Sequence, residues 1–175
     1  TVFANDLKTV IGLAGGRPLI LVGHSIGGMT IQTLARIDRE FVSQNVARVV
    51  LLNTTYTNPL ETTVLSGLAK ALRWPVLEPA LWLTKWLGPL SQLGAWQSYL
   101  SGSAHFANRF GFGADVTRSQ LEATTLLATR NPQGVLAQGN LAMFRWDCSE
   151  ALDSFPVPAL ILAGSKDLLT KAKAS

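Results

Sequence analysis

The stretch PLILVGHSIGGMTIQTLAR, residues 18–36, decides the fold class of this chain. Its first five residues form a short apolar run between Pro and Gly, which is typical of a buried parallel strand. Residues 28–36 have the pattern of a helix. The pentapeptide Gly23-His24-Ser25-Ile26-Gly27 lies between the two elements. A buried strand that turns directly into a helix indicates an α/β fold with a parallel sheet.

The pentapeptide also predicts a chemical site. A Gly-x-Ser-x-Gly turn between strand and helix is a nucleophile elbow, in which a strained backbone pushes the serine hydroxyl out of the sheet. Ser25 is therefore the candidate nucleophile. We expect Gly23 and Gly27 to be required, because a Cβ at either position would collide with the neighbouring strand or helix. The helix start adds a partial positive charge where an oxyanion would form during acyl transfer.

Two further apolar runs, at residues 47–53 and 158–163, predict more strands of the same sheet. About a hundred residues separate them, far more than a connection between two strands needs. We therefore expect a core at residues 1–54, an inserted helical cap at 55–154, and a core strand with its following loop at 155–175. The chain begins without Met, and its first element is a helix over residues 3–11. Because a parallel strand cannot stand alone, we expect the chain to be a fragment.

The middle segment has helical patterns. Asn58-Pro59 predicts a capped helix with Leu60, Val64, Leu68 and Leu72 on one face. Thr117 with Gln120 is a capping-box signature.

Another capped start is expected at Asn131-Pro132.

Trp82, Trp86 and His105 are candidates for contact with a substrate. The Trp- and Leu-rich residues 74–100 are either the packed core of a small cap, the lining of a substrate channel or a contact with a lipid surface. They are too broken and too polar to span a membrane.

Composition limits the classes of partner. The 175 residues are 47% hydrophobic, and the 15 Lys and Arg against 11 Asp and Glu are scattered along the chain. We therefore expect no nucleic-acid partner. Cys148 is the only cysteine, which argues against a disulfide framework or a zinc cluster, and no metal or organic cofactor is implied. A reducing, cytoplasmic location fits this usage, and the oligomeric state stays open.

These stretches resemble the central part of an α/β-hydrolase with a helical cap. The resemblance rests on residues 18–29, on residues 48–54, and on the segment LDSFPVPALILAGSKD at 152–167. It implies that Ser25 is the nucleophile and Asp167, which follows the glycine after the last strand, the acid of a catalytic triad. It also implies that the backbone N–H of Ile26 contributes to an oxyanion hole.

The resemblance also implies two groups that this sequence does not supply. In the family the triad histidine follows the acid in chain order, and a second oxyanion donor comes from an early loop. We expect His24 to pack beneath the turn, with its side chain directed away from Ser25. We expect His105 to lie in the cap. Neither is therefore expected to be the base that must bridge Ser25 and Asp167, and the chain alone is expected to be inactive.

A serine nucleophile resembles esterases, lipases, thioesterases and amidases of this fold. The dehalogenase and epoxide-hydrolase members use Asp at the elbow. The expected reaction is cleavage of a carboxylic ester of a small-to-medium hydrophobic acyl substrate through an acyl-enzyme. A cofactor-free haloperoxidase, a carbon–carbon bond hydrolase and an acyltransferase would use the same triad. A non-catalytic ligand-binding receptor is the alternative from a different class.

Overall fold

The computed structural model describes residues 2–63, 65–150, 155–165, 167 and 170. The chain divides into two compact units, one formed by residues 1–64 and 146–175 and the other by residues 65–145. We call them the α/β unit and the helical unit and describe each by itself. The helical unit lies inside residues 55–154, where the sequence predicts a helical insertion.

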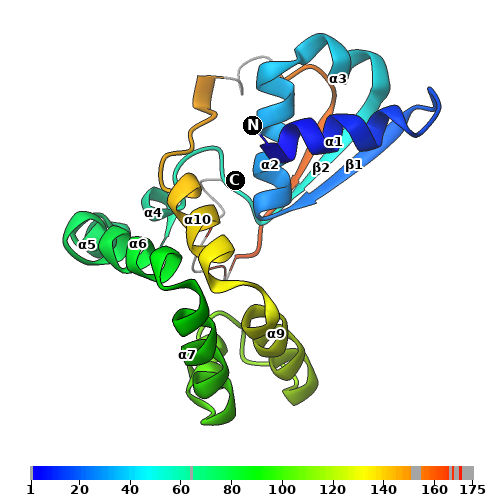
Figure 1. The fold of residues 1–175 in the computed structure, drawn as a ribbon. Helices are drawn as coiled ribbons and strands as arrows, with labels where there is room; N and C mark the ends of the chain where they lie inside the picture. The colour runs from blue at the N-terminus through cyan, green and yellow to red at the C-terminus, as the bar shows by residue number, and fades with distance from the viewer. Residues whose placement is uncertain (1, 64, 151–154, 166, 168–169, 171–175) are drawn as a thin grey trace. The chain divides into compact units, whose positions relative to one another are not determined.

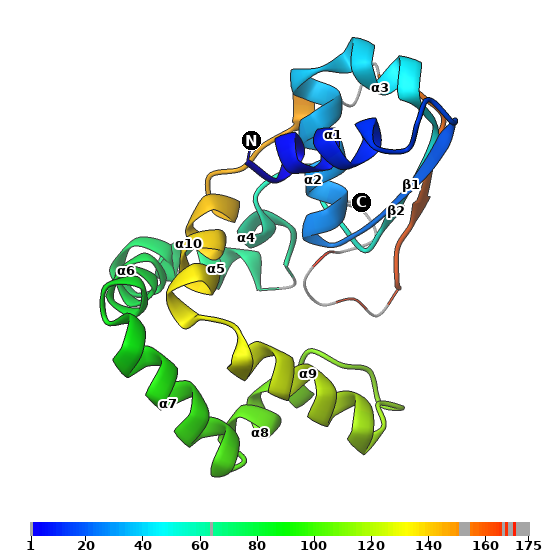
Figure 2. The same cartoon turned by 45° about the vertical axis from the view of Figure 1, so that its right-hand side comes forward.

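The α/β unit is built around a parallel sheet in the order β1-β2-β3. Its elements within the described residues are α1 (Val2–Gly12), β1 (Leu19–His24), α2 (Ile26–Ile37), α3 (Arg39–Asn45), β2 (Val46–Leu52), α4 (Pro59–Thr62) and β3 (Ala159–Leu162). The three apolar runs of the sequence are the three strands. Figures 1 and 2 show α1, α2 and α3 on the same side of this sheet.

One face of the sheet holds the core. Residues alternate along β1, so that Leu19, Leu21 and Gly23 are less exposed than Ile20 and Val22. The buried cluster of the unit consists of Ala4, Ile11, Ile31, Leu34, Ala35, Val42, Val46, Val49 and Leu51. Within the described residues no helix covers the opposite face, where Ile20 and Val22 are 62% and 63% exposed.

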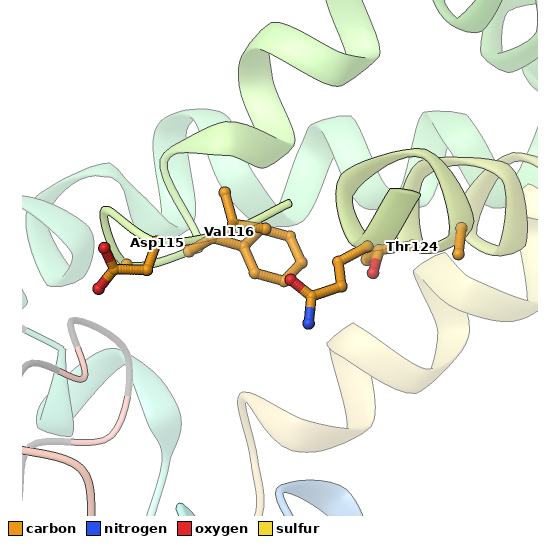
Figure 3. A pocket seen from close by; sticks show the side chains of 7 residues that line it. Asp115, Val116 and Thr124 are labelled. Carbon is orange, nitrogen blue, oxygen red and sulfur yellow. The ribbon is translucent and has the colours of Figure 1, made fainter. Parts of the chain in front are cut away.

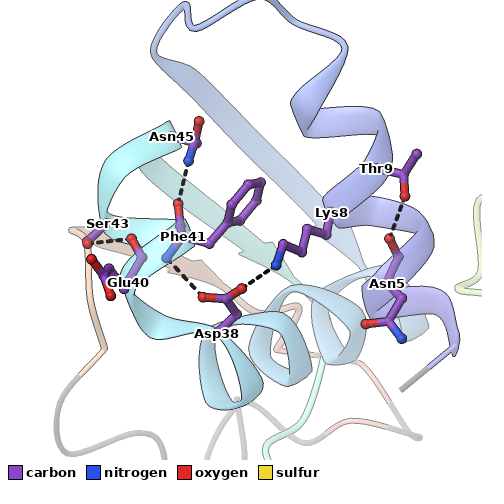
Figure 4. Close-up of polar contacts among 8 residues, drawn as sticks. All are labelled: Asn5, Lys8, Thr9, Asp38, Glu40, Phe41, Ser43 and Asn45. Atoms are coloured by element: carbon purple, nitrogen blue, oxygen red, sulfur yellow. Dashed lines mark hydrogen bonds and ion pairs between the residues drawn. The ribbon is translucent and has the colours of Figure 1, made fainter.

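Polar contacts fix the order of the helices on the covered face. The Lys8 ammonium of α1 lies 2.5 Å from an Asp38 carboxylate oxygen, and the other oxygen accepts a hydrogen bond from Phe41 N at 3.1 Å (Figure 4). The hydrogen bond from Lys8, followed by the one from Phe41, lowers the pKa of the Asp38 carboxyl. Asp38 is thus both the N-cap of α3 and the link to α1.

After the helical unit, residues 146–148 pack on α2 of the α/β unit. Trp146 Nε1 donates to Thr33 Oγ1 at 2.9 Å, and Arg36 Nη1 donates to the Asp147 carbonyl. The Cys148 backbone N–H donates to Tyr56 O at 2.8 Å, and its buried thiol lies 3.4 Å from Gln32 O. These contacts join the two sequence segments of the unit across 92 to 116 positions.

The helical unit consists of helices joined by short turns. Its elements are α5 (Ser66–Leu72), the π-helical turn η1 (Arg73–Leu77), α6 (Glu78–Trp86), α7 (Gly88–Leu100), α8 (Ser103–Arg109), α9 (Arg118–Arg130) and α10 (Gln133–Met143). Within the unit α10 packs against α6 and α7, and both α8 and α9 pack against α7. None of the described helices is long and apolar enough to cross a membrane.

The helix starts predicted from capping residues between residues 58 and 132 are partly confirmed. The Thr117 and Gln120 capping box opens α9 as predicted, and the Asn58 side chain caps α4. The single helix expected to include both Leu60 and Leu72 is wrong, because α4 ends at Thr62 and Thr63 is extended, with ψ 157°. A separate helix, α5, then begins at Ser66.

The start of α10 also differs from the expectation. It begins at Gln133, with Pro132 as the flanking residue, one position later than a proline-first helix would. The Asn131 amide instead donates to Leu127 O at 2.8 Å, at the end of α9.

Candidate active site

Ser25 lies on a strained turn between β1 and α2. Its φ is 51° and its ψ is −120°, a conformation that residues with a side chain rarely adopt. Its N–H donates to Leu52 O at 3.0 Å, and its carbonyl accepts from Gly28 N at 2.9 Å and from Thr54 Oγ1 at 2.8 Å. Such strain persists only where the surroundings hold the backbone, and these three bonds do so. The serine itself is exposed.

The glycine requirement is confirmed at one predicted position and wrong at the other. A Cβ on Gly23 would lie 2.7 Å from Gly28 N and 2.8 Å from the Gly27 carbonyl carbon, so Gly23 is required. A Cβ on Gly27 would meet no described atom within 4 Å. The second required glycine is Gly28, where a Cβ would lie 2.7 Å from Thr54 Cβ and Oγ1.

Ile26 is the first residue of α2. The first N–H groups of a helix have no acceptor inside that helix and lie at the positive end of its dipole. The Ser25 side chain does not cap these groups. The Ile26 N–H is therefore placed at the end of the helix where a negative oxygen beside Ser25 is stabilised.

An apolar cavity adjoins this turn in the α/β unit. It measures about 380 Å³ and lies between α1, β1 and α2. Its lining residues are Phe3, Leu7, Leu21, Val22, Ile26, Gly27, Thr30 and Ile31.

Asp167 follows β3 at the same edge of the sheet. The strand register pairs His24 with Leu52 and Leu52 with Leu162, so the residues after all three strands emerge together. The carboxyl ends of parallel strands are where open α/β sheets bind ligands. The sheet thus brings Ser25 and Asp167 to one edge.

Thr170 bonds the Asp167 carboxylate, and Gly164 bonds the Asp167 backbone. One carboxylate oxygen accepts from Thr170 N at 2.9 Å and the other from Thr170 Oγ1 at 2.7 Å. The Asp167 N–H donates to Gly164 O at 3.1 Å. The residues between Asp167 and Gly164 include position 166, which lies outside the described part of the chain.

Two residues that the sequence analysis did not single out hold this edge together. Asn53, at a φ of 39°, accepts a hydrogen bond from Gly164 N through Oδ1 at 2.7 Å, and its own N–H donates to Leu162 O at 2.9 Å. Thr54 braces the Ser25 carbonyl. The signal that could have found Asn53 is an Asn directly after a strand, because Asn tolerates a positive φ.

The two histidines are placed differently from each other. His24 is exposed, so the expectation that it packs beneath the turn is wrong. The reason is that its neighbours on the same face of β1 meet no helix within the described residues. In the helical unit, His105 Nε2 lies 2.6 Å from Glu122 Oε2, and its Nδ1 is buried without a described partner.

The other substrate-contact candidates also lie in the helical unit. Trp82 and Trp86 are exposed on α6.

A separate open cavity of about 480 Å³ lies beside α9 and the loop before it (Figure 3). Its lining residues are Phe112, Gly113, Asp115, Val116, Gln120, Ala123 and Thr124. In the described part of the chain no group of His, Cys, Asp and Glu is arranged to hold a metal ion.

The sequence matches the model of the alpha/beta hydrolase family over residues 1–174. The chain belongs to the alpha/beta hydrolase family. The family and fold class expected from the sequence are confirmed, with the parallel sheet of this alpha/beta hydrolase described above. No curated protein matches the chain by sequence.

Solved structures show the same fold at low sequence identity. An esterase from Exiguobacterium antarcticum aligns with a TM-score of 0.66 at 17% identity, and a hydrolase from Oleispira antarctica with 0.64 at 15%. Est816, described as an N-acyl homoserine lactone degrading enzyme, aligns with 0.60 at 19%. Each alignment covers 98% of this alpha/beta hydrolase chain, which spans only 57%, 56% and 58% of the three structures in turn.

Proposed function

We propose that the whole protein containing this chain is a serine hydrolase that cleaves a carboxylic ester of a small-to-medium hydrophobic substrate. The observation on which this proposal rests is the strained φ of Ser25 between β1 and α2, fixed by three hydrogen bonds. Strain of this kind collects at functional sites. The family membership supports the same assignment.

The proposed reaction uses Ser25, Ile26 and Asp167 of this chain together with a histidine base. Ser25 Oγ attacks the acyl carbonyl and gives its proton to a histidine base, and the resulting oxyanion lies against the Ile26 N–H. Collapse of the tetrahedral intermediate expels the alcohol and leaves an acyl-serine, which water then hydrolyses. Asp167 orients the base and stabilises its protonated form. We assign the base to neither His24 nor His105.

The helical unit takes the part of a cap in this proposal. We infer that it selects the acyl group, because segments inserted between the strands of a scaffold often carry the residues that bind substrates.

A fluorophosphonate probe tests the nucleophile in the whole protein. We expect labelling of Ser25 alone, because only a serine activated by a base and facing an oxyanion hole reacts readily. Ser25→Ala should remove both the label and the hydrolysis of a short-chain nitrophenyl ester, with a fall in turnover of about a millionfold. Ser43→Ala is the matched control, since Ser43 is an exposed serine on α3 that bonds Glu40 O.

Labelling that persists in Ser25→Ala would overturn the assignment of the nucleophile. Labelling without ester hydrolysis would instead favour the same triad acting as a haloperoxidase, a carbon–carbon hydrolase or an acyltransferase, which product analysis separates. Absence of labelling together with retained ligand binding would favour a receptor.

A further inference from the structure

Helix α6 has one exposed apolar stripe. Pro79, Trp82, Leu83 and Trp86 follow the i, i+3, i+4, i+7 spacing of a single helix face, and all four are exposed. Trp86 is 79% exposed and Leu83 is 59% exposed. Another side of α6 packs on α10. There Glu78 is buried, Leu81, Thr84 and Lys85 are half-buried, and a Cβ on Gly134 of α10 would lie 3.4 Å from the Lys85 carbonyl oxygen.

The elements before α6 have exposed apolar side chains of the same kind. On α5, Leu68 and Leu72 are exposed, as is Leu65 just before it, at i, i+3 and i+7. Trp74 of η1 is 66% exposed. Because α5 packs on η1 and η1 packs on α6, these residues belong to consecutive packed elements. We call the set Leu65, Leu68, Leu72, Trp74, Trp82, Leu83 and Trp86 the Trp–Leu face.

No acidic side chain is exposed among residues 65–114. Residues 65–114 include a single acidic residue, Glu78, which is 2% exposed and paired with Arg73 and Arg145. The Lys85 ammonium lies 4.8 Å from the centre of the Trp82 ring, and the Arg73 guanidinium lies 5.3 Å from that of Trp74. Because Arg73 and Arg145 share the single carboxylate of Glu78, this group keeps one net positive charge, and Lys85 adds a second charge beside Trp82. These elements therefore combine exposed tryptophan and leucine with positive charge.

We propose that the Trp–Leu face docks on the surface of an anionic phospholipid bilayer. Tryptophan rings are favoured at the level of lipid headgroups, and a lysine beside the ring can extend its ammonium to the phosphates while its stem stays on apolar surface. Short helices with an apolar face and flanking cations lie in the plane of the interface rather than crossing the bilayer. The proposal does not depend on the proposed hydrolase activity.

Sedimentation of the full chain with lipid vesicles tests the proposal. We expect binding to vesicles of equimolar phosphatidylcholine and phosphatidylglycerol, weaker binding to pure phosphatidylcholine, and weaker binding as salt is added. Trp86→Gln and Trp82→Gln should each lower the partition coefficient by about tenfold or more, because each removes a large apolar side chain from the interface. Lys85→Gln should lower it about fivefold, the effect of one cation near an anionic surface.

Leu127→Gln on α9 and Val135→Gln on α10 are the matched controls. Both side chains are exposed in the same unit but lie outside the Trp–Leu face, so binding should be unchanged. Far-UV circular dichroism of every variant separates a loss of binding from a loss of fold. The absence of binding to the anionic vesicles by the folded chain would overturn the proposal. Equal losses in the control variants would also overturn it, as would a dimer that Trp86→Gln dissociates in the absence of lipid.

Discussion

The two units of this chain use their polar groups in different ways. In the α/β unit, backbone hydrogen bonds of the parallel sheet join the segments, and side chains such as Asn53 and Thr54 adjust the turns at one edge. In the helical unit, side chains join the helices. Gln92 Nε2 of α7 donates to Thr129 O of α9 at 2.6 Å, and Glu122 of α9 binds both Tyr99 and His105. The first arrangement fixes the turns at the sheet edge where we propose the catalytic residues, whereas the second fixes the packing of helices.

Glu78 shows most clearly how the helical unit is held together. Its buried carboxylate lies 2.7 Å from Arg73 Nε and 3.2 Å from Arg145 Nη2, so it joins η1, α6 and the end of α10. A buried carboxylate is tolerated only when it is paired and hydrogen-bonded. The comparison predicts that substitutions at the sheet edge change chemistry or backbone geometry, while substitutions in the helical unit change stability.

Asp167→Asn should have the largest effect in this comparison. In the whole protein we expect turnover of an ester substrate to fall by about four orders of magnitude with substrate binding retained, because the amide no longer orients the histidine base. Steady-state kinetics with a nitrophenyl ester measure the fall in turnover. Because Asn keeps the size of Asp, the bonds from Thr170 remain geometrically possible.

His105→Ala is the counterpart in the helical unit for the same measurement. Its imidazole is bonded to Glu122, so the substitution should alter substrate preference at most. Loss of activity in His105→Ala with activity retained in Asp167→Asn would show that the acid is misassigned and that His105 takes part in catalysis.

Gly23→Ala should break the turn on which the α/β unit depends. The new Cβ would lie under 3 Å from backbone atoms of Gly27 and Gly28, which cannot move away as a flexible side chain would. We expect a loss of about 3 kcal/mol in the free energy of unfolding, measured by urea denaturation. Gly27→Ala is the control, and it should be neutral or slightly stabilising, because it adds a methyl group in open space within a helix. Equal losses at the two positions would contradict the assignment of Gly23.

Glu78→Gln tests the prediction for the helical unit, where substitutions should change stability. Removing the charge from two hydrogen bonds with arginine should cost about 2 kcal/mol of folding free energy, again measured by urea denaturation. Asp115→Asn, at an exposed residue of the same unit, should change the stability by less than about 0.5 kcal/mol.

The same carboxyl makes the stability of the chain depend on pH. The hydrogen bond from Arg73 lowers the pKa of Glu78 in spite of burial, and the hydrogen bond from Arg145 adds to this. A carboxyl with a lowered folded-state pKa stabilises the fold fully above its unfolded-state pKa, and the stabilisation is lost as the pH falls through the folded value. Glu78→Gln should therefore have a shallower loss of stability on acidification. An unchanged pH profile would exclude Glu78 as a contributor.

The sequence predicted the α/β unit better than the helical unit for a physical reason. A buried strand is an apolar run, and a strand that turns through Gly-x-Ser-x-Gly into a helix has few alternatives. The position of the second required glycine could not be predicted, because it depends on the approach of Thr54 from the loop after β2. Where the helical unit begins, the spacing of Leu60 on α4, and of Leu68 and Leu72 on α5, continues across a helix end, so periodicity alone does not reveal the break.

The buried thiol of Cys148 can be used to measure how often residues 146–150 open. Burial raises the pKa of its thiol, so the reactive thiolate is scarce while the segment stays packed on α2. A thiol reagent can attack only when residues 146–150 detach from Gln32 and Tyr56. The rate of modification therefore reports how often residues 146–150 detach from the rest of the α/β unit, and the measurement needs no substitution.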